Sequence, residues 1–167
     1  MVNLKTKELA KSALMIALIF VGTFSIRIPN LATGGYFHMG DSMIFLGVII
    51  LGKKNGAIAA GIGGALADLL CGATIWMGPT LLIKFIMAFI MGTMIEKNVF
   101  KANILGAMFG GIFQIIAYTF VEALLFTWPA TLGALFGLTM QTLVGFVIYL
   151  VLAKALQTTK LLKLAPQ

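Results

Sequence analysis

Charged side chains are scarce in this chain of 167 residues. Only 10% of the residues are charged, 60% are hydrophobic, and the mean hydropathy is +1.06. Soluble domains carry about 25% charged residues, so the composition excludes an ordinary soluble protein and predicts an integral membrane protein. The length allows about six spans of roughly 20 residues joined by short loops. We therefore expect a single membrane domain, residues 1–167, with no separate soluble domain.

Cysteine and histidine are almost absent. Cys71 is the only cysteine, which excludes an intrachain disulfide and suggests a small packing residue without a redox role. His38 is the only histidine, and because only Asp41 stands near it at a metal-ligand spacing, we expect no metal site. Residues 47–53 match the glycine and lysine spacing of a phosphate-binding loop, but Lys54 replaces the required Ser or Thr. The sequence thus predicts neither a nucleotide site nor a cofactor in this chain.

Apolar segments predict an all-α membrane protein with six transmembrane helices. They cover residues 9–26, 39–52, 55–73, 79–95, 103–127 and 129–153. The first lacks a small-x-small cleavage site and reads as a retained span. The second is short for a hydrocarbon core of about 30 Å. The one long connection, 27–40, contains Pro29, Gly34 and Gly35, which favour turns over a helix.

Basic residues predict how the spans are oriented. In a six-span topology only Arg27 falls on one side of the membrane, whereas ten lysines fall on the other. The positive-inside rule therefore predicts that both termini are cytoplasmic and that the connection 27–40 lies outside. The ten residues are Lys5, Lys7, Lys11, Lys53, Lys54, Lys97, Lys101, Lys154, Lys160 and Lys163.

Lys84 is the most informative residue, because it lies within a segment that is otherwise apolar enough to cross a bilayer. Charges at such positions are costly and usually functional. The carboxylates in or beside other apolar segments are Asp41, Asp68 and Glu122, and the predicted topology puts them near the same outer face as Lys84. We therefore expect a binding pocket there. Lys84 either contacts the ligand or pairs with Asp68 or Glu122 to hold helices together, and both roles are compatible.

The predicted pocket combines charged groups, neutral polar groups and aromatic rings. Such a mixture suits a flat aromatic ligand with polar substituents. Trp76 and Trp128 fit better as anchors at the membrane interface, and Asp41 alternatively as a residue that favours a helix N-terminus. The candidate substrate-binding residues are His38, Asp41, Asp68, Lys84, Gln114, Tyr118 and Glu122.

Small residues form stripes on two predicted helices. Gly56, Ala60 and Gly64 lie on one face of the third span, which predicts a central position for that helix. Ala13 and Ala17 share a face of the first span. This second stripe suits either internal helix packing or the docking of another protein.

Three stretches resemble the substrate-binding S components of energy-coupling factor (ECF) vitamin transporters. They are residues 34–41, 65–72 and 78–84, and the spacing of Ala13 and Ala17 adds to the resemblance. The likeness spans nearly the whole chain and is greatest for the branch that includes riboflavin, pyridoxine and hydroxymethylpyrimidine carriers.

The resemblance implies a capture subunit of a prokaryotic cell-membrane transporter. Such a subunit takes a vitamin from outside and passes it to a membrane coupling subunit and two ATP-hydrolysing subunits, so this chain is no enzyme and ATP is used by its partners. Ala13 and Ala17 would pack against the coupling subunit, and the connection 27–40 would cover the occupied site. Among substrates we prefer pyridoxine or hydroxymethylpyrimidine to riboflavin, which needs a larger cavity.

Other classes of function are less well supported by the residues. A small channel or secondary carrier would use Asp68, Lys84 and Glu122 as a permeation path or proton relay. An intramembrane enzyme with Lys84 or Glu122 as acid or base lacks an evident nucleophile, metal cluster or phosphate clamp. Nucleic acid is not an expected partner, because the cations cluster beside hydrophobic ends and form no basic face.

Overall fold

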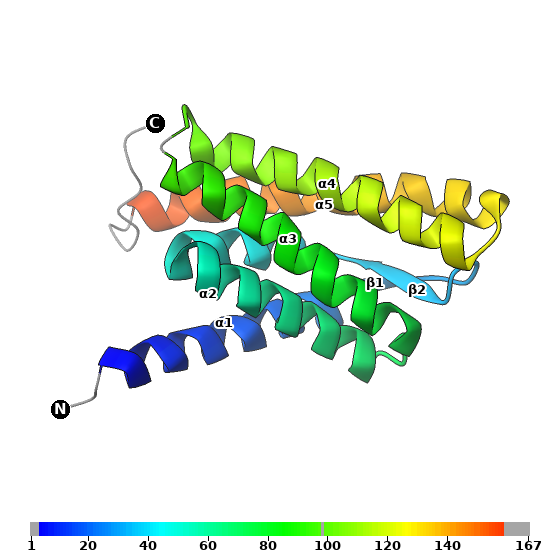
Figure 1. Cartoon of the computed structure of the whole chain (residues 1–167), viewed down its shortest axis with the longest axis horizontal. Coiled ribbons are helices and arrows are strands. Elements are labelled where there is room, and N and C mark those ends of the chain that lie inside the picture. The colour runs from blue at the N-terminus through cyan, green and yellow to red at the C-terminus, as the bar shows by residue number, and fades with distance from the viewer. Residues whose placement is uncertain (1–3, 98, 159–167) are drawn as a thin grey trace.

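A computed structural model describes residues 4–97 and 99–158 of the chain (Figure 1). Lys160 and Lys163, two of the ten lysines that predict the orientation, lie outside these residues. The elements in chain order are α1 (Leu4–Ser25), β1 (Arg27–Asn30), β2 (Gly35–His38), α2 (Asp41–Leu70), the short 3-10 helix η1 (Thr74–Trp76), α3 (Met77–Glu96), α4 (Ala102–Leu125) and α5 (Trp128–Thr158).

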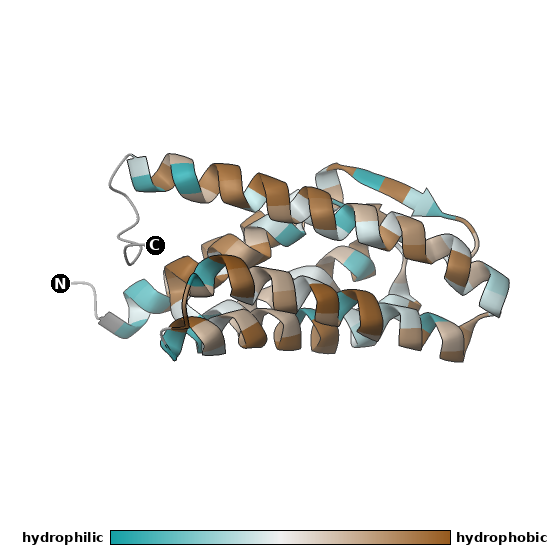
Figure 2. Cartoon of the chain, turned by 90° about the horizontal axis from the view of Figure 1, so that it is seen from above, coloured by the Kyte–Doolittle hydropathy of each residue, from teal (hydrophilic) through white to brown (hydrophobic). Residues whose placement is uncertain are grey.

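The long helices have the length and composition of membrane spans. In the described part of the chain, five helices of 21 to 31 residues are apolar enough to cross a bilayer. Figure 2 shows apolar residues, in brown, along each of the long helices, whereas polar residues mark the start of the chain and part of the hairpin. The prediction of a multi-pass membrane protein built from helices is confirmed, with five candidate spans among the described residues. The start of α1 and the end of α5 lie at the same end of the molecule (Figure 1), and their cytoplasmic location stays a prediction.

The predicted spans 39–52 and 55–73 fall within one element, α2, which is broken at Gly52. The backbone there has φ 77° and ψ 177°, a conformation that glycine adopts without a steric penalty. The two parts of α2 fold back on each other, since a Cβ atom at Gly56 would lie only 2.8 Å from the Cα of Val48. The first part, residues 41–51, provides about 16 Å of helix, too short for a core of about 30 Å. A sixth full-length span is therefore not confirmed.

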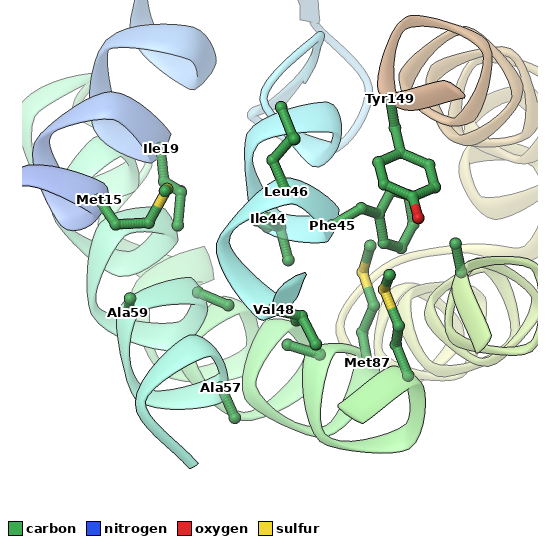
Figure 3. Close-up of a cluster of buried hydrophobic side chains, with 14 of the residues drawn as sticks. Met15, Ile19, Ile44, Phe45, Leu46, Val48, Ala57, Ala59, Met87 and Tyr149 are labelled. Atoms are coloured by element: carbon green, nitrogen blue, oxygen red, sulfur yellow. The ribbon is translucent and has the colours of Figure 1, made fainter. Parts of the chain in front are cut away.

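Helix α2 lies at the centre of the packing, as its small residues predict. A Cβ atom at Gly61 would lie 2.8 Å from a backbone oxygen of α3, and one at Gly63 would lie 2.8 Å from Ile19 of α1. Figure 3 shows the buried cluster in which Phe45 of α2 meets Tyr149 of α5, with ring centroids 5.4 Å apart. These contacts fix the rotation of each helix about its axis.

The connection 27–40 forms an antiparallel hairpin, which the turn residues alone did not predict. Arg27 pairs with His38 across it, and Asn30 pairs with Gly35. The hairpin packs on α5 because Gly137 has no side chain: a Cβ atom there would lie 2.3 Å from the Phe37 ring. The hairpin thus lies over one end of the helices.

Candidate functional site

A cavity lies between the hairpin and the helices. It contains about 530 Å³ of empty space, a figure that includes its opening to solvent. Its walls come from α1, the hairpin, α2, η1, α3, α4 and α5. Segments far apart in the sequence therefore build one site.

Aromatic rings form much of the cavity wall. Trp76 of η1 is 5% exposed, and its indole N–H donates to the Thr33 carbonyl oxygen at 3.1 Å. Its ring lies 6.0 Å from that of Tyr118, centroid to centroid, and both line the cavity. The prediction that Trp76 is an interfacial anchor is therefore wrong, because η1 turns its side chain inward. Trp128, at the start of α5, is 67% exposed, as an anchor would be.

Two carboxylates face the cavity. Asp68 of α2 accepts a hydrogen bond at Oδ1 from the Tyr36 hydroxyl, at 2.7 Å. Its Oδ2 atom and the Oε2 atom of Glu122, on α4, are buried and have no hydrogen-bond partner in the described part of the chain. Both residues line the cavity and are only 6% exposed. Because an unpaired buried polar atom is costly, these oxygens are candidate acceptors for hydrogen bonds from a ligand.

Lys84 lies behind the cavity wall in a fully buried network. Its ammonium donates to Asp41 Oδ1 at 2.5 Å and to Gln114 Oε1 at 2.6 Å. The Gln114 amide donates in turn to Asp41 Oδ2 at 2.7 Å and to the Thr142 hydroxyl at 2.6 Å. The ammonium also lies 5.3 Å from the centre of the Tyr118 ring. Lys84 thus has the pairing role, but its partner is Asp41, so the predicted pairing with Asp68 or Glu122 is wrong.

Gln141 connects this network to the hairpin. Its side-chain amide donates to Asp41 Oδ2 at 3.2 Å, and its oxygen accepts from the His38 backbone N–H at 3.0 Å. The backbone N–H of Gly40 donates to His38 Nδ1 at 3.1 Å, which requires that this ring nitrogen carries no proton. Burial lowers the pKa of His38 to about 4. The imidazole is therefore neutral at physiological pH.

The seven predicted site residues separate into two groups. His38, Asp68, Tyr118 and Glu122 line the cavity. Asp41, Lys84 and Gln114, each 0% exposed, form the network behind it. The structure does not place the second group in direct contact with the cavity. No group of three or more His, Cys, Asp and Glu side chains suited to a metal ion occurs among the described residues.

Sequence reasoning missed the hydroxyl groups of the cavity. Thr23, Thr33 and Thr80 line it, and Thr80 accepts a hydrogen bond from the Tyr118 hydroxyl at 2.9 Å. Thr80 lies four residues before Lys84 and hence on the same face of α3, a spacing that would have identified it. For Thr23 and Thr33 no comparable spacing signal exists.

The small-residue stripe of α1 is exposed. Met15 and Ile19 are buried against α2, whereas Ala13 and Ala17 lie on exposed positions of the same helix. The role of Ala13 and Ala17 in docking another protein stays a prediction.

The helical membrane fold and the cavity under its hairpin are the features of a membrane protein with a site for a small molecule. The chain belongs to the family of ECF-type riboflavin transporter S components, whose sequence profile matches residues 3–158. The resemblance seen in the sequence is thereby confirmed. Family membership makes the chain a multi-pass membrane subunit for the uptake of a vitamin or a vitamin precursor, and a transporter component in place of an enzyme. In general, such subunits act with a coupling subunit and ATPase subunits.

Two relatives match most of the chain. A protein of Lactococcus lactis subsp. cremoris (strain MG1363) named thiamine precursor transporter HmpT is 30% identical over 162 residues, which cover 96% of this chain and 93% of the relative. An uncharacterised protein of Pyrococcus woesei is 32% identical over 131 residues, which cover 78% of this chain and 88% of the relative.

Proposed function

We propose that this chain captures a small aromatic vitamin or precursor from outside the cell, with hydroxymethylpyrimidine or pyridoxine as substrate. The observation that carries the proposal is the cavity itself, in which aromatic rings surround two buried carboxylate oxygens without partners. A flat ring packs against such walls, and its hydroxymethyl, hydroxyl or amino substituents satisfy the carboxylates.

The name of the Lactococcus relative, a thiamine precursor transporter, supports the pyrimidine over the pyridine. Hydroxymethylpyrimidine carries an amino group and a hydroxymethyl group on a compact ring, and both donate hydrogen bonds. Pyridoxine carries hydroxyl donors at a similar distance from its ring and is the second candidate. Riboflavin, after which the family is named, ranks third because its three-ring body and ribityl chain are bulkier than either of the other candidates.

In this proposal the cavity residues and the buried network have different tasks. His38, Asp68, Tyr118 and Glu122 contact the ligand. Asp41, Lys84 and Gln114 act indirectly, because Gln141 transmits their positions to the hairpin at His38. The cation of Lys84 beside the Tyr118 ring holds that wall in place.

Transport in this proposal depends on other subunits. The chain uses no cofactor of its own, and ATP is hydrolysed by two partner subunits. A membrane coupling subunit docks on Ala13 and Ala17 of α1, whose exposed positions support this assignment. The protein resides in a prokaryotic cell membrane with cytoplasmic termini, in agreement with the distribution of its lysines.

The proposed function is tested by identifying what the protein carries. The detergent-solubilised chain is purified, the mass of any copurifying small molecule is measured, and that molecule is titrated back onto emptied protein. We expect near-stoichiometric hydroxymethylpyrimidine or pyridoxine with tight rebinding. Protein that binds no member of a vitamin panel, but conducts ions or protons when reconstituted alone, would support the channel or carrier alternative.

A further inference from the structure

The acidic groups at the cavity surface face no charged partner in the described part of the chain, because the one histidine at that surface, His38, is neutral. Asp68 and Glu122 each present a buried oxygen without a partner there. Among the described residues that line the cavity there is no lysine and no arginine. An anionic ligand would therefore meet carboxylates and no facing cation.

The cation behind the cavity wall is already neutralised. Lys84 is 0% exposed, and its ammonium is bonded to Asp41 and Gln114. To bind an anion, Lys84 would have to break this pair and leave Asp41 buried without a counter-ion, which is strongly unfavourable. His38 offers no compensating charge, because its Nδ1 accepts the hydrogen bond of the Gly40 backbone.

We propose that Asp68 and Glu122 set the substrate class by charge, so that the cavity binds the free, hydrogen-bond-donating form of the ring compound and excludes its phosphate ester. This inference rests on the proposed function and adds a rule for selectivity. Ligand donors satisfy Asp68 Oδ2 and Glu122 Oε2, and such bonds to charged groups are among the strong ones. A phosphate monoester instead brings a charge of about −1.5 to −2 beside two carboxylates in a site of low dielectric constant.

The test compares matched ligands on the purified full chain in detergent by isothermal titration. Hydroxymethylpyrimidine and pyridoxine are each compared with their own phosphate monoesters. An uncharged acetate ester of each alcohol serves as a control for the added bulk and for the loss of the hydroxyl donor, both of which the phosphate ester shares. We expect the phosphate ester to bind at least about 100-fold more weakly than the free alcohol, and the acetate ester to lose much less affinity.

Two variants test the carboxylates, and a third provides a matched control. Asp68→Asn and Glu122→Gln remove one charge each with little change in shape, whereas Glu96→Gln removes a carboxylate that pairs with Lys53 outside the cavity. We expect each cavity variant to weaken binding of the free alcohol about 10-fold. The ratio of the Kd of the phosphate ester to the Kd of the free alcohol should also fall about 10-fold. The Glu96→Gln variant should bind like the wild type.

Each result supports or overturns the inference. Equal binding of alcohol and phosphate by the wild type would overturn it and leave the proposed function standing. Equal rejection of the acetate and phosphate esters would show exclusion by size or by loss of the hydroxyl donor, without a role for charge, and would also overturn it. Both cavity variants could instead lose affinity while the ratio of alcohol to phosphate affinity stays unchanged. These carboxylates would then have a purely structural role, and the inference would be overturned. If a variant fails to fold, the affinities of the wild type for the free alcohol, the acetate ester and the phosphate ester still decide whether charge excludes the phosphate. If no ligand of any form binds, the proposed function fails, and the inference with it.

Discussion

Replacing Lys84 with methionine tests the buried network most directly. The substitution keeps an unbranched side chain in the same space but removes the cation, so Asp41 remains at 0% exposure without a counter-ion. Breaking a buried pair by removing one partner costs about 3–5 kcal/mol. Because Asp41 retains amide donors from Gln114 and Gln141, we expect the lower end, about 3 kcal/mol. For a chain of this length that corresponds to a fall in Tm of about 6–12 °C.

A second substitution separates the charge effect from lost packing. In the double variant Lys84→Met with Asp41→Asn, no charge is left in this network, and the Asn amide can donate to the Gln114 oxygen that Lys84 has vacated. We expect this double variant to regain about 2 kcal/mol relative to Lys84→Met alone. Lys53→Met is the control, because Lys53 and its partner Glu96 are both partly exposed, and such a pair contributes less than about 1 kcal/mol.

The assay is thermal unfolding of each purified variant in the same detergent, with ligand titration in parallel. Lys84→Met should also weaken ligand capture, since the network positions Gln141 and the hairpin. A Tm for Lys84→Met within about 2 °C of the wild type would refute the reasoning. So would a double variant no more stable than the single one, because the two charges would then not be coupled.

Three further predictions concern the hairpin, the cavity wall and α1. Because burial lowers the pKa of His38 from 6.5 to about 4, the unfolded chain takes up a proton that the folded chain does not. His38 therefore makes stability fall as the pH drops from 6.5 to about 4, and His38→Gln should flatten this part of the curve of Tm against pH; an unchanged slope would contradict the burial effect. Trp76→Phe should abolish the change in tryptophan fluorescence on ligand binding, because exposed Trp128 lies outside the cavity, and a retained signal would place the ligand elsewhere. Ala13→Trp or Ala17→Trp should spare ligand binding and prevent copurification with the coupling subunit, whereas normal assembly of both variants would move the docking surface to another helix.

Much of the site was predictable because charged groups inside apolar segments are conspicuous. Asp68, Lys84 and Glu122 stand out against their neighbours in the sequence, and all three lie in or beside the cavity wall. Their pairing was not predictable, because topology gives depth along the membrane normal but not the direction in which a side chain points around its helix. Trp76 was misassigned for the same reason, since only the turn at η1 shows that its ring points inward.

The sequence by itself determined the membrane fold class, the apolar segments and the family. A bilayer demands about 20 apolar residues per helical span, so hydropathy alone reports these segments, and the family motifs are local. Only the tertiary structure decided that α2 folds back at Gly52 and that the connection 27–40 forms a hairpin on α5. It likewise decided that Lys84 pairs with Asp41, across 43 positions of the chain. These features depend on contacts between distant segments, which set the rotation and tilt of each helix.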